Sequence, residues 1–166
     1  MYLLGHVGIG VHLIPERLRK PVRWLALGCV LPDLLDKPWW LLMGALHAQQ
    51  AGTRLFGHTL LFSALLLGAA LLFSSTSLRA LSLGALTHAA LDVAGELAAG
   101  TQQIWHRWLL WPLFGWRFPV ETNWVPPPVS ERSIYFAAEA VGLAFLLLDF
   151  IRWRRSRPAP RRSEPK

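Results

Sequence analysis

The sequence predicts an all-α integral membrane protein: a polytopic bundle of about five membrane segments with one further tryptophan-rich helix at the membrane surface. Three observations predict this fold class. Apolar residues make up 53% of the 166 residues and charged residues only 16%, whereas an ordinary soluble domain has about 25% charged residues. Several apolar stretches approach or reach the roughly 20 residues that cross a bilayer. Basic residues gather at the ends of these stretches.

The first two apolar stretches, residues 2–14 and about 22–35, are short for a membrane span. Pro32 lies inside the second, where a proline removes a backbone N–H and is expected to break or kink the helix. Backbone groups freed at membrane depth must be buried in protein or line a wet cavity. We therefore expect the segment around Pro32 to form part of a site rather than a surface that faces lipid.

Three later stretches, residues 55–73, 78–98 and 133–153, are long enough to cross the bilayer. The short polar turn between the first two predicts an antiparallel hairpin. The third leads directly into the basic end of the chain.

The segment before the last span contains Trp105, Trp108 and Trp111 at helical spacing. Tryptophan at such spacing is typical of a helix that lies in the headgroup layer. A loop helix packed on the bundle is an equally good interpretation of the same spacing. The chain thus divides into a membrane-embedded helical domain, residues 1–153, and a basic tail, residues 154–166, which is expected to be disordered.

The basic residues predict a topology. If the loops at 15–23 and 74–77 and the tail share one side, with Arg79 and Arg152 at the adjoining helix ends, that side has 12 of the 17 Lys and Arg residues. The positive-inside rule then predicts an inner or cell membrane protein with five spans, its C-terminus in the cytoplasm. Such clusters are expected to contact anionic lipid headgroups. The net charge is +7, which could suggest that the protein binds nucleic acid. The basic clusters flank apolar segments, and this position argues against nucleic-acid binding.

Ionisable side chains lie within the apolar stretches, where they are costly and by default mark a functional site. They are His6, Asp33, Asp36, His58, His88, Asp92 and Glu139. His88 and Asp92 are four residues apart and share one helix face, as two ligands of one cation do. Pairing the ends of the predicted hairpin brings His58 to nearly the depth of Asp92, and similar counting places Glu139 opposite Asp92.

Imidazoles and carboxylates gathered at one depth predict a divalent cation, because an uncompensated buried carboxylate costs on the order of several kcal/mol. Mixed nitrogen and oxygen ligands suit Zn²⁺ best, with Mn²⁺ or Fe²⁺ as alternatives. The predicted metal ligands are His6, Asp33, Asp36, His58, His88 and Asp92. The predicted catalytic residues are Arg54, which would receive an anionic group such as a phosphate, and Glu139, which would orient a ligand or act as a base.

For single residues, a structural interpretation is also open, because polar side chains can hydrogen bond across helices at about 1 kcal/mol each. We interpret His12, His47 and His106 in this way. His12 falls toward the opposite end of its helix, and the other two lie in segments expected at the surface.

The ensemble of motifs resembles the membrane-bound metal-dependent hydrolases, a family of small polytopic proteins with a distant likeness to zinc-dependent phospholipase C. The motifs are GHVGIG with His6, LPDLLDKP with Asp33 and Asp36, TRLFGHTLLF with Arg54 and His58, GALTHAALD with His88 and Asp92, and LLWP at 109–112. The chain has Thr59 in place of a serine and Thr53 where many relatives have a further histidine, so one ligand of the related pattern is missing.

This resemblance implies a metal-dependent hydrolase that acts on a lipid or lipid-linked ester or phosphoester. The alternative is a membrane scaffold or binding protein whose polar layer holds the helices together. An ion transporter is the third interpretation, and the sequence favours it least, because transport needs a polar path to both membrane faces.

Overall fold

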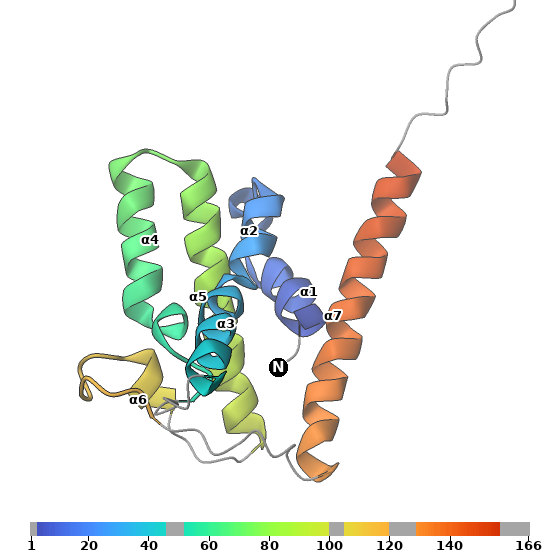
Figure 1. Ribbon diagram of the computed structural model, residues 1–166. Helices are drawn as coiled ribbons and strands as arrows, with labels where there is room; N and C mark the ends of the chain where they lie inside the picture. Colours follow the sequence, from blue (N-terminus) through green and yellow to red (C-terminus); the bar gives the residue numbers. More distant parts are fainter. Residues whose placement is uncertain (1–2, 46–51, 100–104, 120–128, 157–166) are drawn as a thin grey trace, which may run out of the picture.

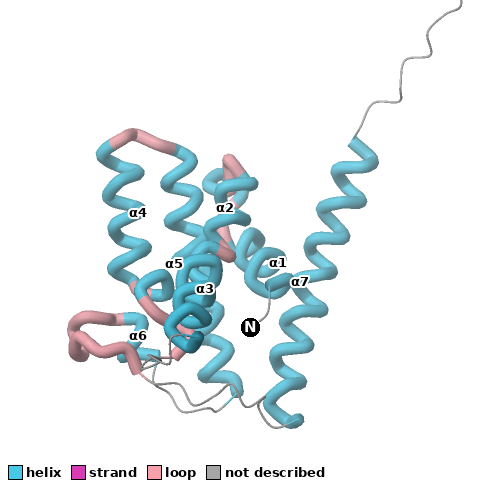
Figure 2. The backbone as a smooth tube through the Cα atoms, viewed as in Figure 1, coloured by secondary structure: helices cyan, strands magenta, loops and turns pink. Residues whose placement is uncertain are grey.

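The computed structural model describes residues 3–45, 52–99, 105–119 and 129–156. Every regular element in these ranges is a helix, as Figure 2 shows, so the predicted all-α class is confirmed for the described part of the chain. The helices are α1 Leu3–Leu13, α2 Val22–Gly28, α3 Leu31–Ala45, α4 Leu60–Leu72, α5 Thr76–Ala99, α6 Trp105–Leu109 and α7 Val129–Ser156, with single 3₁₀ turns η1 Glu16–Leu18 and η2 Phe56–His58.

Helix α5 lies at the centre of the arrangement (Figure 1). It runs antiparallel to α4, as the short turn between them predicts, and it packs along α2 on another side and against α1. Helix α7 stands at the edge and packs mainly on α1. The chain therefore surrounds one helix with elements that come from both halves of the sequence.

Two helix crossings are so close that only glycine fits at them. A Cβ atom on Gly8 of α1 would overlap the backbone of Gly142 in α7, and a Cβ atom on Gly84 of α5 would overlap backbone atoms of Leu25 and Gly28 in α2. Small residues let helix backbones approach in this way where lipid gives no hydrophobic drive for association. These contacts position α1 against α7 and α2 against α5.

One described helix is long and apolar enough to cross a membrane, namely residues Ser133–Ser156 of α7. Helices α1 and α4 are apolar but shorter. Helix α5 has 24 residues, yet it contains Arg79, Asp92 and Glu96, which lower its hydropathy. The structure thus shows a helical bundle with one candidate membrane helix among the described residues. The predicted five spans remain a prediction.

Three predicted boundaries differ from the structure. The apolar stretch at about 22–35 is broken into two helices, as predicted, but the break does not fall at Pro32 itself. The break falls at Cys29 and Val30, and Pro32 lies in the first turn of α3, where its missing N–H leaves no helix bond unmade. His58 ends the η2 turn and precedes α4 rather than lying one turn inside it. The tryptophan-rich helix is short, because α6 ends at Leu109, and the full burial of Trp108 agrees with a helix packed on the bundle, the second of the two interpretations of its spacing.

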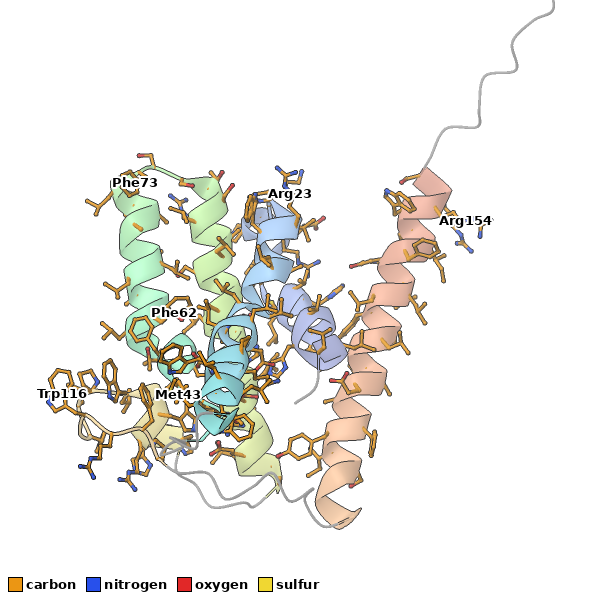
Figure 3. All side chains as sticks on the ribbon, viewed as in Figure 1. Arg23, Met43, Phe62, Phe73, Trp116 and Arg154 are labelled. Carbon is orange, nitrogen blue, oxygen red and sulfur yellow. The ribbon has the colours of Figure 1, made fainter. Side chains whose placement is uncertain are left out.

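The segments predicted to share the basic side of a membrane do lie at one end of the molecule. Figure 3 shows Arg23 at the start of α2, Phe73 before the α4–α5 turn and Arg154 near the end of α7, all at the same end of the bundle. Trp116 and Met43 lie toward the other end. These segments therefore share one end of the bundle, whereas the predicted membrane side of that end stays a prediction.

Candidate metal centre

Five of the predicted ligands converge beside the C-terminal half of α5. Two groups of three side chains have ligand atoms within 4.8 Å of one another: His6, His88 and Asp92, and Asp33, His58 and His88. They come from α1, α3, η2 and α5, and His88 belongs to both groups. The three histidines are each only 1% exposed. The shared depth of His58, His88 and Asp92 that the sequence predicts is thus present in the structure.

Asp36 holds His58 in one orientation. Its carboxylate accepts hydrogen bonds from the backbone N–H groups of Leu55 (2.8 Å), Gly57 (2.9 Å) and His58 (3.2 Å). The His58 Nδ1 lies 2.7 Å from Asp36 Oδ2. Because this oxygen is an acceptor of N–H groups, Nδ1 donates to it, and in the neutral ring the lone pair is on Nε2. Asp36 belongs to neither group of three, and its contacts suit an orienting partner of a ligand.

A backbone carbonyl orients His88 in the same way. Its Nδ1 lies 2.7 Å from the carbonyl oxygen of Cys29. A carbonyl only accepts hydrogen bonds, so Nδ1 donates and the lone pair of the neutral ring is on Nε2. The Cys29 carbonyl is available because α2 ends at Gly28 and the chain turns before α3 begins.

When both rings are neutral, their two lone pairs therefore face each other. The His58 Nε2 and His88 Nε2 atoms are 3.2 Å apart, and the rings are nearly perpendicular at 73°. Two nitrogen lone pairs at this distance repel unless a proton or a cation lies between them. Two nitrogen ligands on one tetrahedral Zn²⁺ would be roughly 3.3 Å apart, given Zn–N bonds of about 2.0–2.1 Å. The observed separation fits such an ion.

Two carboxylates lie next to this nitrogen pair. Asp33 Oδ1 is 3.4 Å from His58 Nε2 and 3.9 Å from His88 Nε2. Asp92 Oδ2 is 3.8 Å and 3.9 Å from the same two atoms. A site of two imidazole nitrogens with neighbouring carboxylate oxygens is a donor set that Zn²⁺ takes in proteins.

His6 has a different geometry. Its ring stacks on His88 with centroids 3.9 Å apart and only 13° between the planes. Ring lone pairs lie in the ring plane, so two stacked imidazoles cannot both aim at one ion midway between them. His6 Nε2 is instead 3.1 Å from Asp92 Oδ1. We therefore favour Asp33, His58 and His88 as the group that holds an ion, with His6 beside Asp92.

The Arg54 side chain is 20% exposed, and it pairs with two buried carboxylates of the network. Its Nε donates to Asp92 Oδ2 at 2.8 Å and its Nη1 to Glu96 Oε1 at 2.9 Å. Its guanidinium also lies 5.1 Å from the ring centre of Trp108, whose Nε1 donates to Glu96 at 3.3 Å. Two buried carboxylates and an aromatic face thus surround the group that the sequence assigns to an anionic ligand.

Glu139 belongs to α7, and its side chain reaches the start of α1. Its carboxylate accepts the backbone N–H groups of Leu4 (3.0 Å) and Gly5 (2.8 Å), which lack partners within the first turn of the helix. The structure thus places Glu139 where it fixes the end of the helix that contains His6.

The histidines expected to be structural lie outside the cluster wherever they are described. His12 stacks on Phe145 and approaches Asp149 at 3.4 Å, between α1 and α7. His106 makes an edge contact with Phe114. His47 falls outside the described residues.

Sequence reasoning missed three partners of the site, namely the Cys29 carbonyl, Trp108 and Glu96. Glu96 follows Asp92 by four residues, so the spacing that linked His88 to Asp92 also points to it. Nothing in the sequence points to a particular carbonyl, because its availability depends on where α2 ends.

No family model matches the chain, and neither a curated protein nor a solved structure matches it. The resemblance drawn from the motifs therefore remains a prediction, and any functional proposal rests on the geometry of the site.

Proposed function

We propose that this protein is a membrane-embedded, metal-dependent hydrolase that acts on a lipid or lipid-linked ester or phosphoester. The observation behind the proposal is the 3.2 Å contact between His58 Nε2 and His88 Nε2. Each ring has its other nitrogen bonded to a fixed acceptor. Such a pair is arranged to bind a cation, and two carboxylates lie next to it.

The residues have distinct parts in this proposal. His58, His88 and Asp33 bind the ion, for which Zn²⁺ is the best fit and Mn²⁺ or Fe²⁺ are alternatives. When bound, such an ion supplies Lewis acidity and a water that is deprotonated near neutral pH. Asp36 and the Cys29 carbonyl orient the two imidazoles. His6 contacts one carboxylate oxygen of Asp92 and Arg54 donates to the other, so the two residues orient Asp92.

A membrane location agrees with the exterior of the bundle. Large apolar side chains are exposed on α1, α3, α4 and α7, and α7 is long and apolar enough to span a bilayer. A hydrolase in this setting meets lipid substrates at the headgroup layer. The basic end of the bundle, which includes Arg23 and Arg154, would contact anionic lipid headgroups.

The test is metal content and activity of the detergent-purified, metal-replete protein. We expect stoichiometric divalent metal in the wild type and in His12→Ala, a matched histidine outside the cluster, and loss of metal in His88→Ala. Turnover on a panel of lipid esters and phosphoesters is expected to disappear in His88→Ala and Asp33→Ala. A wild-type protein without stoichiometric metal would refute the proposal.

One observation favours a second function, a non-catalytic scaffold. The contact between His58 and His88 is also satisfied by a single proton, and the neighbouring carboxylate of Asp92 has partners in Arg54 and His6. In that case alanine substitutions at these histidines lower the free energy of unfolding and change no metal content. Metal analysis of the same variants separates the two functions.

A further inference from the structure

The polar cluster reaches the exterior at Asp33. The Asp33 side chain is 20% exposed, whereas the side chains of His58 and His88 are 2% and 1% exposed. Asp33 Oδ1 faces His58 Nε2 at 3.4 Å, and Oδ2 accepts a hydrogen bond from Lys37 Nζ at 2.6 Å. One carboxylate therefore connects the nitrogen pair to an ammonium group on the outside.

Lys37 is better placed than Arg54 to meet a ligand. Its side chain is 50% exposed, against 20% for Arg54. Arg54 is engaged by Asp92 and Glu96. An ammonium group has three N–H donors, and the bond to Asp33 uses one of them. Neutralisation of Asp33 by a cation would weaken its attraction for Lys37 and so release the ammonium toward an anion.

The surface around Lys37 is apolar. Leu34 and Leu41 lie three residues before and four after it on α3, so all three share one helix face. They are 56% and 58% exposed. A positive charge between two exposed leucines suits an amphiphile, with an anionic group at the ammonium and hydrocarbon beside it.

We propose that Lys37 binds the phosphoryl oxyanion of the substrate at the outer side of the metal centre, which makes the substrate a phosphoester. This inference rests on the proposed function, and it deepens it by choosing between neutral esters and phosphoesters. Lys37 is a binding residue here, and it is one that the motifs do not assign.

The test uses zinc-loaded, full-length protein in phosphatidylcholine nanodiscs titrated with inorganic phosphate, followed by calorimetry. We expect the wild type to bind phosphate and Lys37→Met to bind it about tenfold more weakly or worse, because a charge-assisted hydrogen bond is lost. Lys37→Arg should stay close to the wild type. Lys20→Met, which removes a lysine from the loop after η1, should not change the affinity.

Zinc content is measured on each sample. Wild-type affinity in Lys37→Met, or no phosphate binding by zinc-loaded wild type, would overturn the inference while leaving the metal site intact. Absence of zinc from the wild type would instead overturn the proposed function. In a second arm, phosphatidic acid is added to the nanodiscs. Displacement of inorganic phosphate by this lipid assigns the site to a lipid phosphate, and no displacement assigns it to a soluble one.

Discussion

The two long helices, α5 and α7, are similar in length but differ in what they bury and what they expose. Helix α5 has 24 residues and buries Ser82, Thr87, His88, Asp92 and Glu96 among small neighbours. Helix α7 has 28 residues, and its apolar side chains face outward along most of its length. By length and apolarity only α7 qualifies as a membrane helix within the described ranges.

Hydropathy therefore finds the helix with an apolar exterior and misses the helix with the buried imidazole and carboxylates. A helix enclosed by neighbours can contain carboxylates and imidazoles, because protein partners compensate their desolvation. The same groups lower its hydropathy. If this contrast is right, substitutions at polar residues around α5 should have larger effects than matched substitutions along α7.

The largest effect is expected for Asp92→Ala, which removes a buried carboxylate and takes one of its acidic partners from the partly buried Arg54. Breaking a buried ion pair costs about 3–5 kcal/mol. Chemical unfolding in detergent, followed by circular dichroism, measures the loss. Asp149→Ala on α7 is the matched control, because that carboxylate is 45% exposed, and it should cost far less. Equal losses in the two variants would show that the contrast between the helices is wrong.

The next largest effect is expected at the crossing of α2 and α5. Gly84→Ala introduces a Cβ atom that overlaps the backbone of Leu25 and Gly28, and such overpacking costs about 1–3 kcal/mol. A Cβ atom on Gly68 of α4 would meet nothing within 4 Å, so Gly68→Ala should stabilise the helix by about 0.5–1 kcal/mol. The two variants should move the unfolding midpoint in opposite directions, and a shared direction contradicts the close crossing.

Asp36→Asn tests how the candidate metal centre depends on an orienting carboxylate. The amide keeps the size of the side chain but removes one acceptor oxygen from a group that receives three backbone N–H bonds and His58 Nδ1. Substitution of such a partner lowers metal affinity about 10–100-fold. Competition with a zinc chelator measures the affinity. Asp149→Asn on α7 should bind zinc like the wild type, and an equal loss there would argue against a specific role for Asp36.

The smallest effect is expected for His12→Phe between α1 and α7. Phenylalanine can keep the ring contact with Phe145, now 4.4 Å between centroids, and loses the polar approach to Asp149. Polar contacts between membrane helices are worth about 0.6 kcal/mol on average. The free energy of unfolding should therefore change by less than about 1 kcal/mol, and the metal content should stay unchanged. Loss of metal would connect α7 to the site and so weaken the contrast with α5.

The helical class, the α4–α5 hairpin and the approach of His58 to His88 and Asp92 could be predicted from spacing in the chain, whereas the predicted place of Glu139 opposite Asp92 could not, because Glu139 caps the start of α1. His88 and Asp92 share a face because a helix repeats every 3.6 residues, and His58 reaches them because it directly precedes α4, which runs antiparallel to α5 after a short turn. Both the spacing within one helix and the length of one turn are local features of the sequence, so they can be predicted without a structure.

The part that each polar group plays depended instead on how the helices pack. Asp36 meets His58 because Gly57 lets η2 approach α3 closely, and the Cys29 carbonyl meets His88 because α2 ends against α5. Arg54 faces Asp92 and Glu96 while Lys37 remains outside. These contacts join distant parts of the chain, and no single stretch of sequence contains the information that sets them.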